Sequence, residues 1–430
     1  MTVLISGAGV AGLTLGLSLH QVGIPFRIIE AIAELRPLGF GINLQPHAVR
    51  ELYDLGLEEK MDRIGLRTGK TSYFNSQGQE IWSEARGLEA GYAYPQYSVH
   101  RGALQMMLHE TLLERCGPKA ILAGAKVSEW LETPRGLEVI LTDRQYGFEL
   151  DRMRGSVLIA SDGARSETRQ TLFPDVGGPN RRNSMMWRGV ARSQRFLDGR
   201  TMTISGTKGQ KFVAYPIGDR GKTQSFVHWI ADLANAPERD YDTQGWGRKG
   251  SIDDVLPSFG DWRFDWLDIP ALIGGTEAVW EWPMVDRDPL PSWTEGRIAL
   301  LGDSAHPMYP IGSNGASQGI LDARVMARSL RDHGETTLAL QDYDADRREA
   351  VNAIILANRT QGPDAILDRV ADLAPDGFDD IDAVMPEADR RAISDRYKEA
   401  TGLTVEEVNA QPSIIGPMGD QPNYTGPLKD

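Results

Sequence analysis

The chain has 430 residues, a formal net charge of −14 at pH 7, 41% hydrophobic residues and 25% charged residues. This length exceeds the size at which one hydrophobic core usually stops growing, so we expect two closely packed domains. The acidic balance disfavours nucleic acid or an anionic membrane as a partner, because either would need a basic surface.

The cysteine and histidine content of the chain indicates its cellular compartment and whether it binds a metal. The only cysteine, Cys116, cannot form an internal disulfide, which fits a reducing compartment and predicts a cytoplasmic protein. The seven histidines show no metal-ligand spacing, so we expect no metal site. No apolar run approaches the ~18 residues of a membrane span, and the apolar N-terminus lacks the basic flank of a signal peptide.

The first thirty residues follow the pattern of a dinucleotide-binding unit. We expect a buried strand over Thr2–Ser6, a glycine-rich turn over Gly7–Gly12, a helix over Leu13–Val22 and a strand over Ile24–Glu30. A bare GxGxxG sequence is weak evidence. Between a strand and a helix, and with an acid ending the next strand, it becomes specific.

Each part of this turn has a physical role. Gly7 permits a tight turn, Gly9 lets the backbone approach a pyrophosphate, and Gly12 allows close helix–strand packing. Glu30 can accept a hydrogen bond from a ribose hydroxyl. The chain then enters a glycine-rich stretch, residues 36–41, rather than the next strand of a doubly wound sheet, which favours the longer cofactor FAD over NAD.

Two further segments approach the same ligand in this interpretation. Arg101 precedes an amphipathic helix over 104–115, where it can reach a phosphate or ribose; a surface charge is the alternative. After a small strand meander over 125–142, a buried strand at 157–160 ends in the turn Asp162-Gly163.

The composition changes between about 185 and 283, which predicts a second domain. Alternating runs at Lys211–Ile217 and Gln224–Ile230 indicate an antiparallel sheet, one face of which could cover a planar ligand. For any single tryptophan, an ordinary core position is the alternative. The tryptophans of this region are Trp187, Trp229, Trp246, Trp262, Trp266, Trp280 and Trp282.

A second strand–loop–helix segment follows. The apolar run Ile298–Leu301 predicts a buried strand, Gly302-Asp303 ends it, and a loop rich in proline and glycine leads to a helix near Asn314. The Asp303 carboxylate can accept hydrogen bonds from hydroxyls, and the free N–H groups of the helix start favour negative charge. Taken alone, this could be an ordinary connection.

Helices are then expected over 315–332 and 337–360, followed by a tail rich in Pro, Asp and Glu with one helix at 387–401. We interpret this tail as a contact extension. The predicted domains are a first FAD-binding part (1–180), a substrate domain (181–285), a second FAD-binding part (286–360) and a C-terminal extension (361–430).

The glycine-rich turn with Glu30, Asp162-Gly163 and Gly302-Asp303 together resemble the motifs of the class A, single-component flavoprotein aromatic hydroxylases, over residues 1 to about 360. Within that family the chain is most similar to hydroxylases of phenazine carboxylates. The segments that carry this likeness are RPLGFGIN (36–43), YPQYSVHRG (94–102), MWRGV (186–190), VAYPI (213–217) and PMVDRDPLP (283–291).

The resemblance implies an α/β fold: a Rossmann-like FAD-binding domain of the p-hydroxybenzoate hydroxylase type, interleaved with an antiparallel-sheet substrate domain, plus a C-terminal helical extension. It also implies non-covalent FAD, with NADH or NADPH and O2 as co-substrates. Asp303 would bind the ribityl chain, and residues 310–316 would lie along the isoalloxazine. The implied FAD-binding residues are Gly7, Gly9, Val10, Ala11, Gly12, Glu30, Ala31, Gly41, Arg101, Val127, Asp162, Gly163, Gly302, Asp303, Pro310, Gly312, Ser313, Asn314, Gly315 and Ala316.

The implied activity is hydroxylation of a planar aromatic or heteroaromatic substrate, expected to be carboxylated, through a flavin C4a-hydroperoxide, with decarboxylation as an option. Arg188 and Lys211 are candidates to meet a substrate carboxylate and Tyr215 to bond a ring hydroxyl, with a structural role open for each. The rivals are another FAD oxidase or dehydrogenase and a non-catalytic flavin-binding protein. The expected partner is a small aromatic substrate, bound by a monomer or homodimer.

Overall fold

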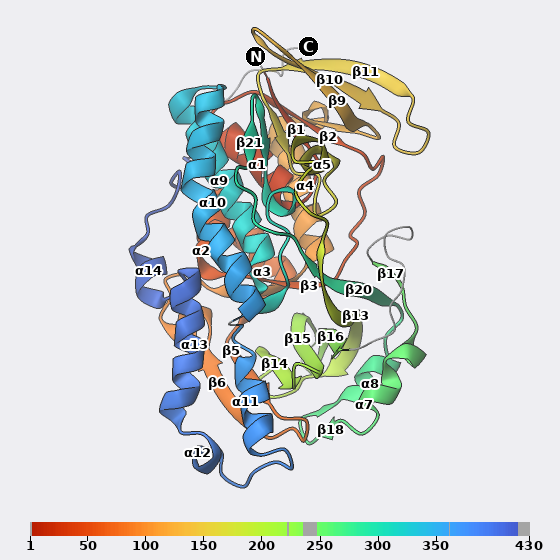
Figure 1. Cartoon of the computed structure of the whole chain (residues 1–430), viewed down its shortest axis with the longest axis vertical. Helices are drawn as coiled ribbons and strands as arrows, with labels where there is room; N and C mark the ends of the chain where they lie inside the picture. Colours follow the sequence, from red (N-terminus) through yellow and green to blue (C-terminus); the bar gives the residue numbers. More distant parts are fainter. Residues whose placement is uncertain (1, 222, 235–246, 361, 420–430) are drawn as a thin grey trace.

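The computed structural model describes residues 2–221, 223–234, 247–360 and 362–419. A mainly parallel sheet forms the upper half in Figure 1, and a larger sheet forms the lower half. The long helix α10 (Thr337–Thr360) runs down one side and connects the two levels. This arrangement agrees with the predicted FAD-binding and substrate domains interleaved along the chain.

The upper sheet has six strands, which are parallel except for the edge strand β21. Because neighbouring strands run in the same direction, their carboxyl ends meet at one edge of the sheet, where α/β proteins place their ligands. In spatial order the strands are β21 (Thr294–Glu295), β22 (Ile298–Leu300), β12 (Leu158–Ala160), β1 (Val3–Ser6), β2 (Phe26–Glu30) and β8 (Ile121–Ala123).

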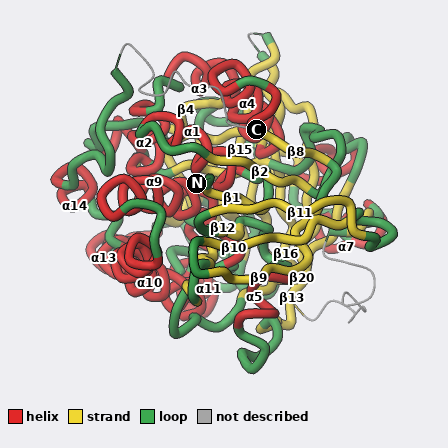
Figure 2. The backbone as a smooth tube through the Cα atoms, turned by 90° about the horizontal axis from the view of Figure 1, so that it is seen from above, coloured by secondary structure: helices red, strands yellow, loops and turns green. Residues whose placement is uncertain are grey.

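Alternation along β1 buries both faces of this sheet. Val3 and Ile5 pack toward the helices α1 (Val10–Gln21), α4 (Arg101–Cys116) and α9 (Gly315–His333). Leu4 packs in a separate cluster with the predicted meander. In the view from above, α1, α4 and α9 lie on one side of β1 and the meander on the other (Figure 2). The meander consists of β9 (Lys126–Thr133), β10 (Gly136–Thr142) and β11 (Glu149–Gly155).

The lower sheet has eight strands, and all of its pairs are antiparallel except β14 with β5. Two of its strands, β5 and β6, come from the first hundred residues, so this sheet draws chain from the segment predicted as the first FAD-binding part. In spatial order the strands are β17 (Arg248–Lys249), β20 (Val279–Asp286), β13 (Asn180–Gln194), β16 (Gln224–Ala234), β15 (Gln210–Arg220), β14 (Thr201–Gly206), β5 (Lys70–Phe74) and β6 (Glu80–Ala85).

The predicted tryptophan face divides between the two sides of this sheet. Trp282 lines the cavity between the two halves of the molecule. Trp187 and Trp229 lie in the core on the opposite side, against the helices α7 (Leu256–Phe259) and α8 (Ile269–Gly274). Trp262 and Trp266 belong to the same core, Trp280 is partly exposed, and Trp246 lies outside the described residues. The core alternative therefore holds for Trp187, Trp229, Trp262 and Trp266, but not for Trp280.

The remaining elements surround these sheets. A small sheet lies between the two halves, and the tail helices pack beside β5 and β6. The predicted helix at 387–401 matches α13. These elements are β3 (Gly41–Leu44), β7 (Gln96–His100), β4 (Gly65–Thr68), β18 (Arg263–Phe264), β19 (Leu267–Asp268), α2 (Pro46–Asp54), α3 (Glu58–Ile64), α5 (Glu167–Leu172), α11 (Ala365–Leu373), α12 (Ile381–Val384), α13 (Glu387–Thr401) and α14 (Val405–Ala410).

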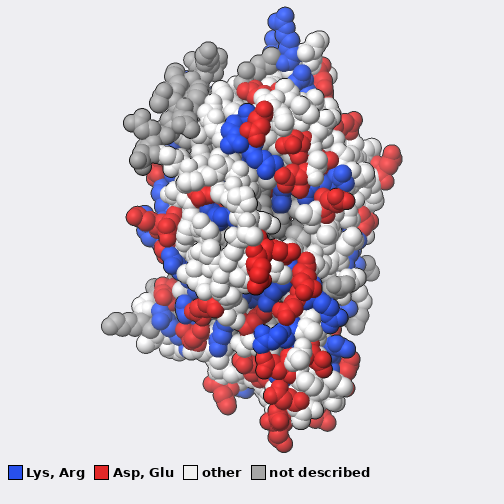
Figure 3. Space-filling model, turned by 90° about the vertical axis from the view of Figure 1, so that its left-hand side faces the viewer, with Lys and Arg blue, Asp and Glu red and all other residues white. Residues whose placement is uncertain are grey.

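Charged side chains are mixed over the face that carries α10 and α13, with no large field of one sign (Figure 3). Within the described ranges, no helix combines the length and apolar character that crossing a membrane requires.

A buried ion pair connects three helices of the upper half. Arg324 on α9 contacts Glu51 on α2 at 3.1 Å, and both side chains are fully buried. Arg324 also donates to Gln21 Oε1 on α1 at 2.6 Å. Glu51 thus supplies the direct counter-charge of this guanidinium inside the core, and Asp54 adds a weaker one.

We expect Glu51→Ala to destabilise the protein by about 3–5 kcal/mol, because it leaves a buried cation without its counter-charge. Chemical unfolding measures the change. Glu34→Ala is the control, since the Glu34–Arg36 pair is exposed and should contribute at most about 1 kcal/mol. Equal losses of unfolding free energy in Glu51→Ala and Glu34→Ala would contradict the stabilising role assigned to the buried Glu51–Arg324 pair.

Candidate functional site

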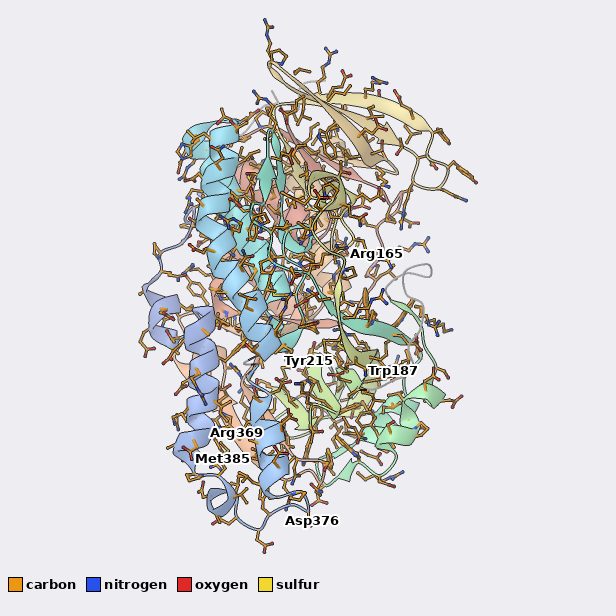
Figure 4. The ribbon with its side chains drawn as sticks, in the orientation of Figure 1. Arg165, Trp187, Tyr215, Arg369, Asp376 and Met385 are labelled. Atoms are coloured by element: carbon orange, nitrogen blue, oxygen red, sulfur yellow. The ribbon has the colours of Figure 1, made fainter. Side chains whose placement is uncertain are left out.

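A cavity of about 880 Å³ lies between the carboxyl ends of the upper strands and one face of the lower sheet. Its lining includes the glycine-rich turn, Asp162-Gly163 and the 302–316 segment above, and strands β13, β15 and β16 below. In Figure 4, Tyr215 lies at the level between the two halves. The three motifs singled out from sequence therefore meet at one cavity.

The glycine-rich turn needs its glycines for steric reasons. Gly7 has φ +103°, and a Cβ there would lie 2.4 Å from the Ser161 carbonyl oxygen. A Cβ on Gly12 would lie 2.1 Å from the Gly7 oxygen. Gly9 lines the cavity and has open space where its Cβ would be. The turn is therefore packed tightly on the protein side and open on the cavity side.

Glu30 holds this turn in place. One carboxylate oxygen accepts from the Ala8 N–H at 2.7 Å and the other from the Ile32 N–H at 2.7 Å. Glu30 and Ala31 do not line the cavity described here, and Val127 is buried between the sheet and the meander. Their contacts with a cofactor therefore stay predictions.

Ser304 joins the other two motifs. Its hydroxyl donates to Asp162 Oδ1 at 2.9 Å and accepts from the Gly163 N–H at 2.9 Å. Ser304 follows Asp303 directly, so the turn after β12 and the turn after β22 form one hydrogen-bonded unit. The sequence patterns above do not indicate this role, although the position of Ser304 directly after Asp303 is a signal for it.

The buried carboxylate of Asp322 holds the Gly302-Asp303 turn in place. Asp322 Oδ2 accepts from the Gly302 N–H at 3.2 Å and contacts His306 Nε2 at 2.5 Å, while Oδ1 accepts from Arg347 Nε at 2.9 Å. Burial alone would raise the pKa of Asp322, but His306 and Arg347 outweigh it and lower the pKa. Asp303 itself is exposed at the cavity, and the described residues give its carboxylate no hydrogen bond.

The cavity favours an anionic ligand at this end. Helices α1 and α9 both begin at it, so their unpaired first N–H groups face the cavity. Three exposed arginines, Arg101, Arg144 and Arg165, lie on its lining (Arg165 is labelled in Figure 4). Positive ends of helices and a basic rim suit a pyrophosphate.

The donor set fits FAD. Gly9 leaves room for a pyrophosphate, the Asp303 carboxylate can accept from ribityl hydroxyls, and the loop before α9 presents Asn314, whose buried Oδ1 has no hydrogen-bond partner among the described residues. Gly41, Pro310, Gly312, Ser313, Gly315 and Ala316 also line the cavity, and their contacts with FAD stay predictions.

The three predicted substrate contacts share one face of the lower sheet and line the cavity. Lys211 is already paired: Nζ lies 2.6 Å from Asp364 and 3.4 Å from Asp232. Burial alone would lower the pKa of Lys211, but these carboxylates outweigh it and raise the pKa. Arg188 makes no such pair within the described ranges; its Nη2 contacts Met186 Sδ at 3.5 Å, and its buried Nε has no partner.

The fold and the site together fit a protein that binds FAD, and comparison with known proteins refines this class. The family model described as an FAD binding domain matches residues 1–357. The chain belongs to this family.

Two relatives and one solved structure agree with that assignment. A phenazine 1,6-dicarboxylic acid hydroxylase of Lysobacter antibioticus is 41% identical over 83% of this chain and 89% of the relative. A 3-hydroxybenzoate 6-hydroxylase of Aquipseudomonas alcaligenes is 30% identical over 80% of this chain and 84% of the relative. A salicylate hydroxylase substrate complex, 20% identical, matches the fold with a TM-score of 0.71 over 96% of this chain and 98% of its own.

The protein is therefore an FAD-dependent monooxygenase that uses NAD(P)H and O2. The expected family, fold class and cofactors are confirmed, and so is the likeness to a phenazine carboxylate hydroxylase. The two rivals, another class of FAD oxidoreductase and a non-catalytic flavin-binding protein, find no support among these relatives.

Glu30→Ala should weaken FAD binding by about 1–3 kcal/mol, because the turn and the ribose lose a charged acceptor. Quenching of flavin fluorescence during titration of apoprotein measures the dissociation constant. The exposed Glu34→Ala serves as the control. Unchanged affinity in Glu30→Ala would place the ribose elsewhere.

Ser304→Ala should weaken FAD binding by about 1–2 kcal/mol, since the two motif turns lose both hydrogen bonds that join them. The same titration applies. Ser292→Ala, which removes a hydroxyl bonded to Thr294 away from the cavity, should leave the affinity unchanged. A similar loss in both variants would refute the specific role of Ser304.

Proposed function

We propose that the protein hydroxylates a fused aromatic or heteroaromatic carboxylic acid whose carboxylate binds Arg188. The observation that carries this proposal is the unpaired guanidinium: Arg188 lines the cavity, its Nε is buried, and no carboxylate of the described residues forms an ion pair with it. Burial lowers the pKa of Arg188, and the nearby Tyr215 and Asp232 offset this only in part. The lowered pKa reflects the free-energy penalty of burying a cation. A bound carboxylate would remove this penalty and can form two parallel hydrogen bonds with the guanidinium.

The floor of the cavity supports an extended flat ring system. The strand register aligns Arg188, Ile230, Val213 and Ile204 in one row across four neighbouring strands. Three strand spacings of ~4.8 Å give the row a length of roughly 14 Å. The apolar part of the row, from Ile230 to Ile204, covers two of these spacings, roughly 10 Å, which is longer than one benzene ring. Trp282 and Met284 also line the cavity.

Lys211 is the weaker candidate for the carboxylate. Its two ion pairs already neutralise it, and a substrate anion would have to compete with Asp364 and Asp232. We therefore assign Lys211 a structural role and assign binding of the substrate carboxylate to Arg188.

Tyr215 supplies a neutral hydrogen-bonding group beside Arg188. Burial raises the pKa of Tyr215, and the nearby Arg188 lowers it by less, so the hydroxyl stays protonated at neutral pH. The ring packs edge-on against His228 with centroids 5.1 Å apart, which fixes its position. In this arrangement Tyr215 can bond a ring hydroxyl or a ring nitrogen of the substrate.

Reduced FAD supplies the oxygen chemistry when it is bound. The chain's own residues bind the acid at Arg188, orient the ring along the apolar row and exclude water from it. One atom of O2 enters the ring and the other leaves as water, with NAD(P)H as reductant. Where the attacked carbon bears the carboxylate, loss of CO2 restores aromaticity, so decarboxylative hydroxylation is compatible with this binding mode.

The relatives support the acid class, since one is named for a phenazine dicarboxylic acid and another for a hydroxybenzoate. The single cysteine supports a cytoplasmic setting. We further propose that the protein acts as a monomer or homodimer on a freely diffusing substrate.

Arg188→Met should lower kcat/KM for aromatic acids about 10–100-fold, because the charge-assisted hydrogen bonds to the carboxylate contribute about 1.5–3 kcal/mol. Substrate-stimulated NADH oxidation and oxygen uptake are measured with phenazine-1-carboxylic acid, phenazine-1,6-dicarboxylic acid and their amides. The amides should stimulate weakly in the wild type and be little affected by the change.

The matched control is Arg192→Met, since Arg192 is an exposed residue of the same strand that lies outside the cavity lining. Amides that work as well as the acids, or an acid preference that survives Arg188→Met, would overturn the substrate class. Absence of any stimulated NAD(P)H oxidation would instead count against the catalytic function itself.

A further inference from the structure

The loop that leads into α9 is held by a residue from the C-terminal tail. Residues 309–314 line the cavity between the Gly302-Asp303 turn and the start of α9. Tyr397 on α13 reaches this loop from a position 83 residues further along the chain than Asn314, and it is 5% exposed. The family model ends at residue 357, so Tyr397 lies outside it.

Three hydrogen bonds form a chain through Tyr397. Asn314 Nδ2 donates to the Tyr397 hydroxyl at 2.9 Å, and this hydroxyl donates to Asn358 Oδ1 at 2.9 Å. Asn358 Nδ2 then donates to the Tyr309 carbonyl oxygen at 3.4 Å. The pair Tyr397–Asn358 therefore holds both ends of the 309–314 loop.

The middle of the loop packs directly on the same hydroxyl. Gly312 has φ +69°, and a Cβ there would lie 1.7 Å from the Tyr397 hydroxyl oxygen. From the other side, Gln45 Nε2 donates to the Gly312 carbonyl oxygen at 3.2 Å. Only a glycine can lie between these two contacts without displacing the tail helix.

The hydrogen bond to Tyr397 fixes the orientation of the Asn314 side-chain amide. Because Asn314 gives its Nδ2 group to Tyr397, its Oδ1 is left on the other side of the amide. Asn314 is fully buried, lines the cavity, and the described residues offer its Oδ1 no donor. A buried carbonyl oxygen without a donor is unfavourable, so a ligand donor is the natural complement.

We propose that Tyr397 is a positioning residue that orients the Asn314 amide, so that Asn314 Oδ1 accepts a hydrogen bond from an N–H of the bound isoalloxazine. The tail thus contributes to the cofactor site through the loop, without being part of the FAD-binding domain. This inference depends on the FAD assignment and not on the substrate class, so its tests need no substrate.

The principal variant is Tyr397→Phe, which keeps the ring and removes the hydroxyl. FAD should bind about tenfold more weakly to its apoprotein, measured by quenching of flavin fluorescence, and the absorption bands of the bound flavin should shift. Tyr343→Phe is the matched control, because it too removes the hydroxyl of a buried tyrosine. The Tyr343 hydroxyl donates to the Leu300 carbonyl oxygen at 3.1 Å and not to the 309–314 loop. This variant should leave the bound flavin spectrum unchanged.

A double-mutant cycle separates positioning from general loss of stability. If Tyr397 acts through Asn314, the effects of Tyr397→Phe and Asn314→Ala on FAD affinity will be strongly non-additive, with the double variant close to Asn314→Ala alone. Asn358→Ala, which removes the acceptor of the Tyr397 hydroxyl, should shift affinity and spectrum in the same direction as Tyr397→Phe. The Asn358→Ala variant can therefore test the proposal even if Tyr397→Phe folds poorly.

Additive effects, a spectrum unchanged in Tyr397→Phe, or an equal loss of affinity in Tyr343→Phe would each overturn the proposal. Thermal unfolding of the apoproteins of the wild type and of all five variants, followed in parallel, shows whether any loss of affinity merely follows a loss of stability. None of these outcomes bears on Arg188, so failure here leaves the proposed substrate class untouched.

Discussion

The cofactor cleft depends on one fully buried carboxylate, that of Asp322. It accepts from the backbone of Gly302 and contacts His306 and Arg347 at the point where β22 ends. These contacts hold Gly302 in place and so set the direction in which the chain leaves the sheet. The positions of Asp303 and of the loop before α9 depend on that direction. A buried charge is tolerated there because its partners satisfy both oxygens. The motif visible in sequence is thus supported by residues outside it.

The charges of the cavity fall into two kinds. Lys211 is matched by carboxylates of the protein, as Arg324 is in the core. The guanidinium of Arg188, by contrast, lines the cavity, and its buried Nε has no partner among the described residues. Compensated charges hold elements together, whereas an uncompensated buried one is where a ligand of opposite sign gains most. The substrate is expected to be anionic on this argument.

Local patterns in the sequence predicted much of the upper half, because the glycine-rich turn with Glu30 and the Gly302-Asp303 turn each belong to a short strand–turn–helix segment that can be recognised by itself. Contacts between distant segments were beyond such patterns. Nothing near Lys211 indicates Asp364, which lies 153 residues away, and nothing near Asn314 indicates Tyr397. The tryptophans illustrate the same limit, since the pleat of each strand and the position of α7 and α8 decide which ones face a ligand.

The contribution of the tail has a consequence for biosynthesis. Tyr397 and Asp364 leave the ribosome after every residue of the FAD-binding domain, yet they hold the 309–314 loop and neutralise Lys211. A nascent chain that has completed only the first 357 residues lacks these contacts in the cavity wall. From the role proposed for Tyr397, we expect tight cofactor binding only after the tail has been synthesised.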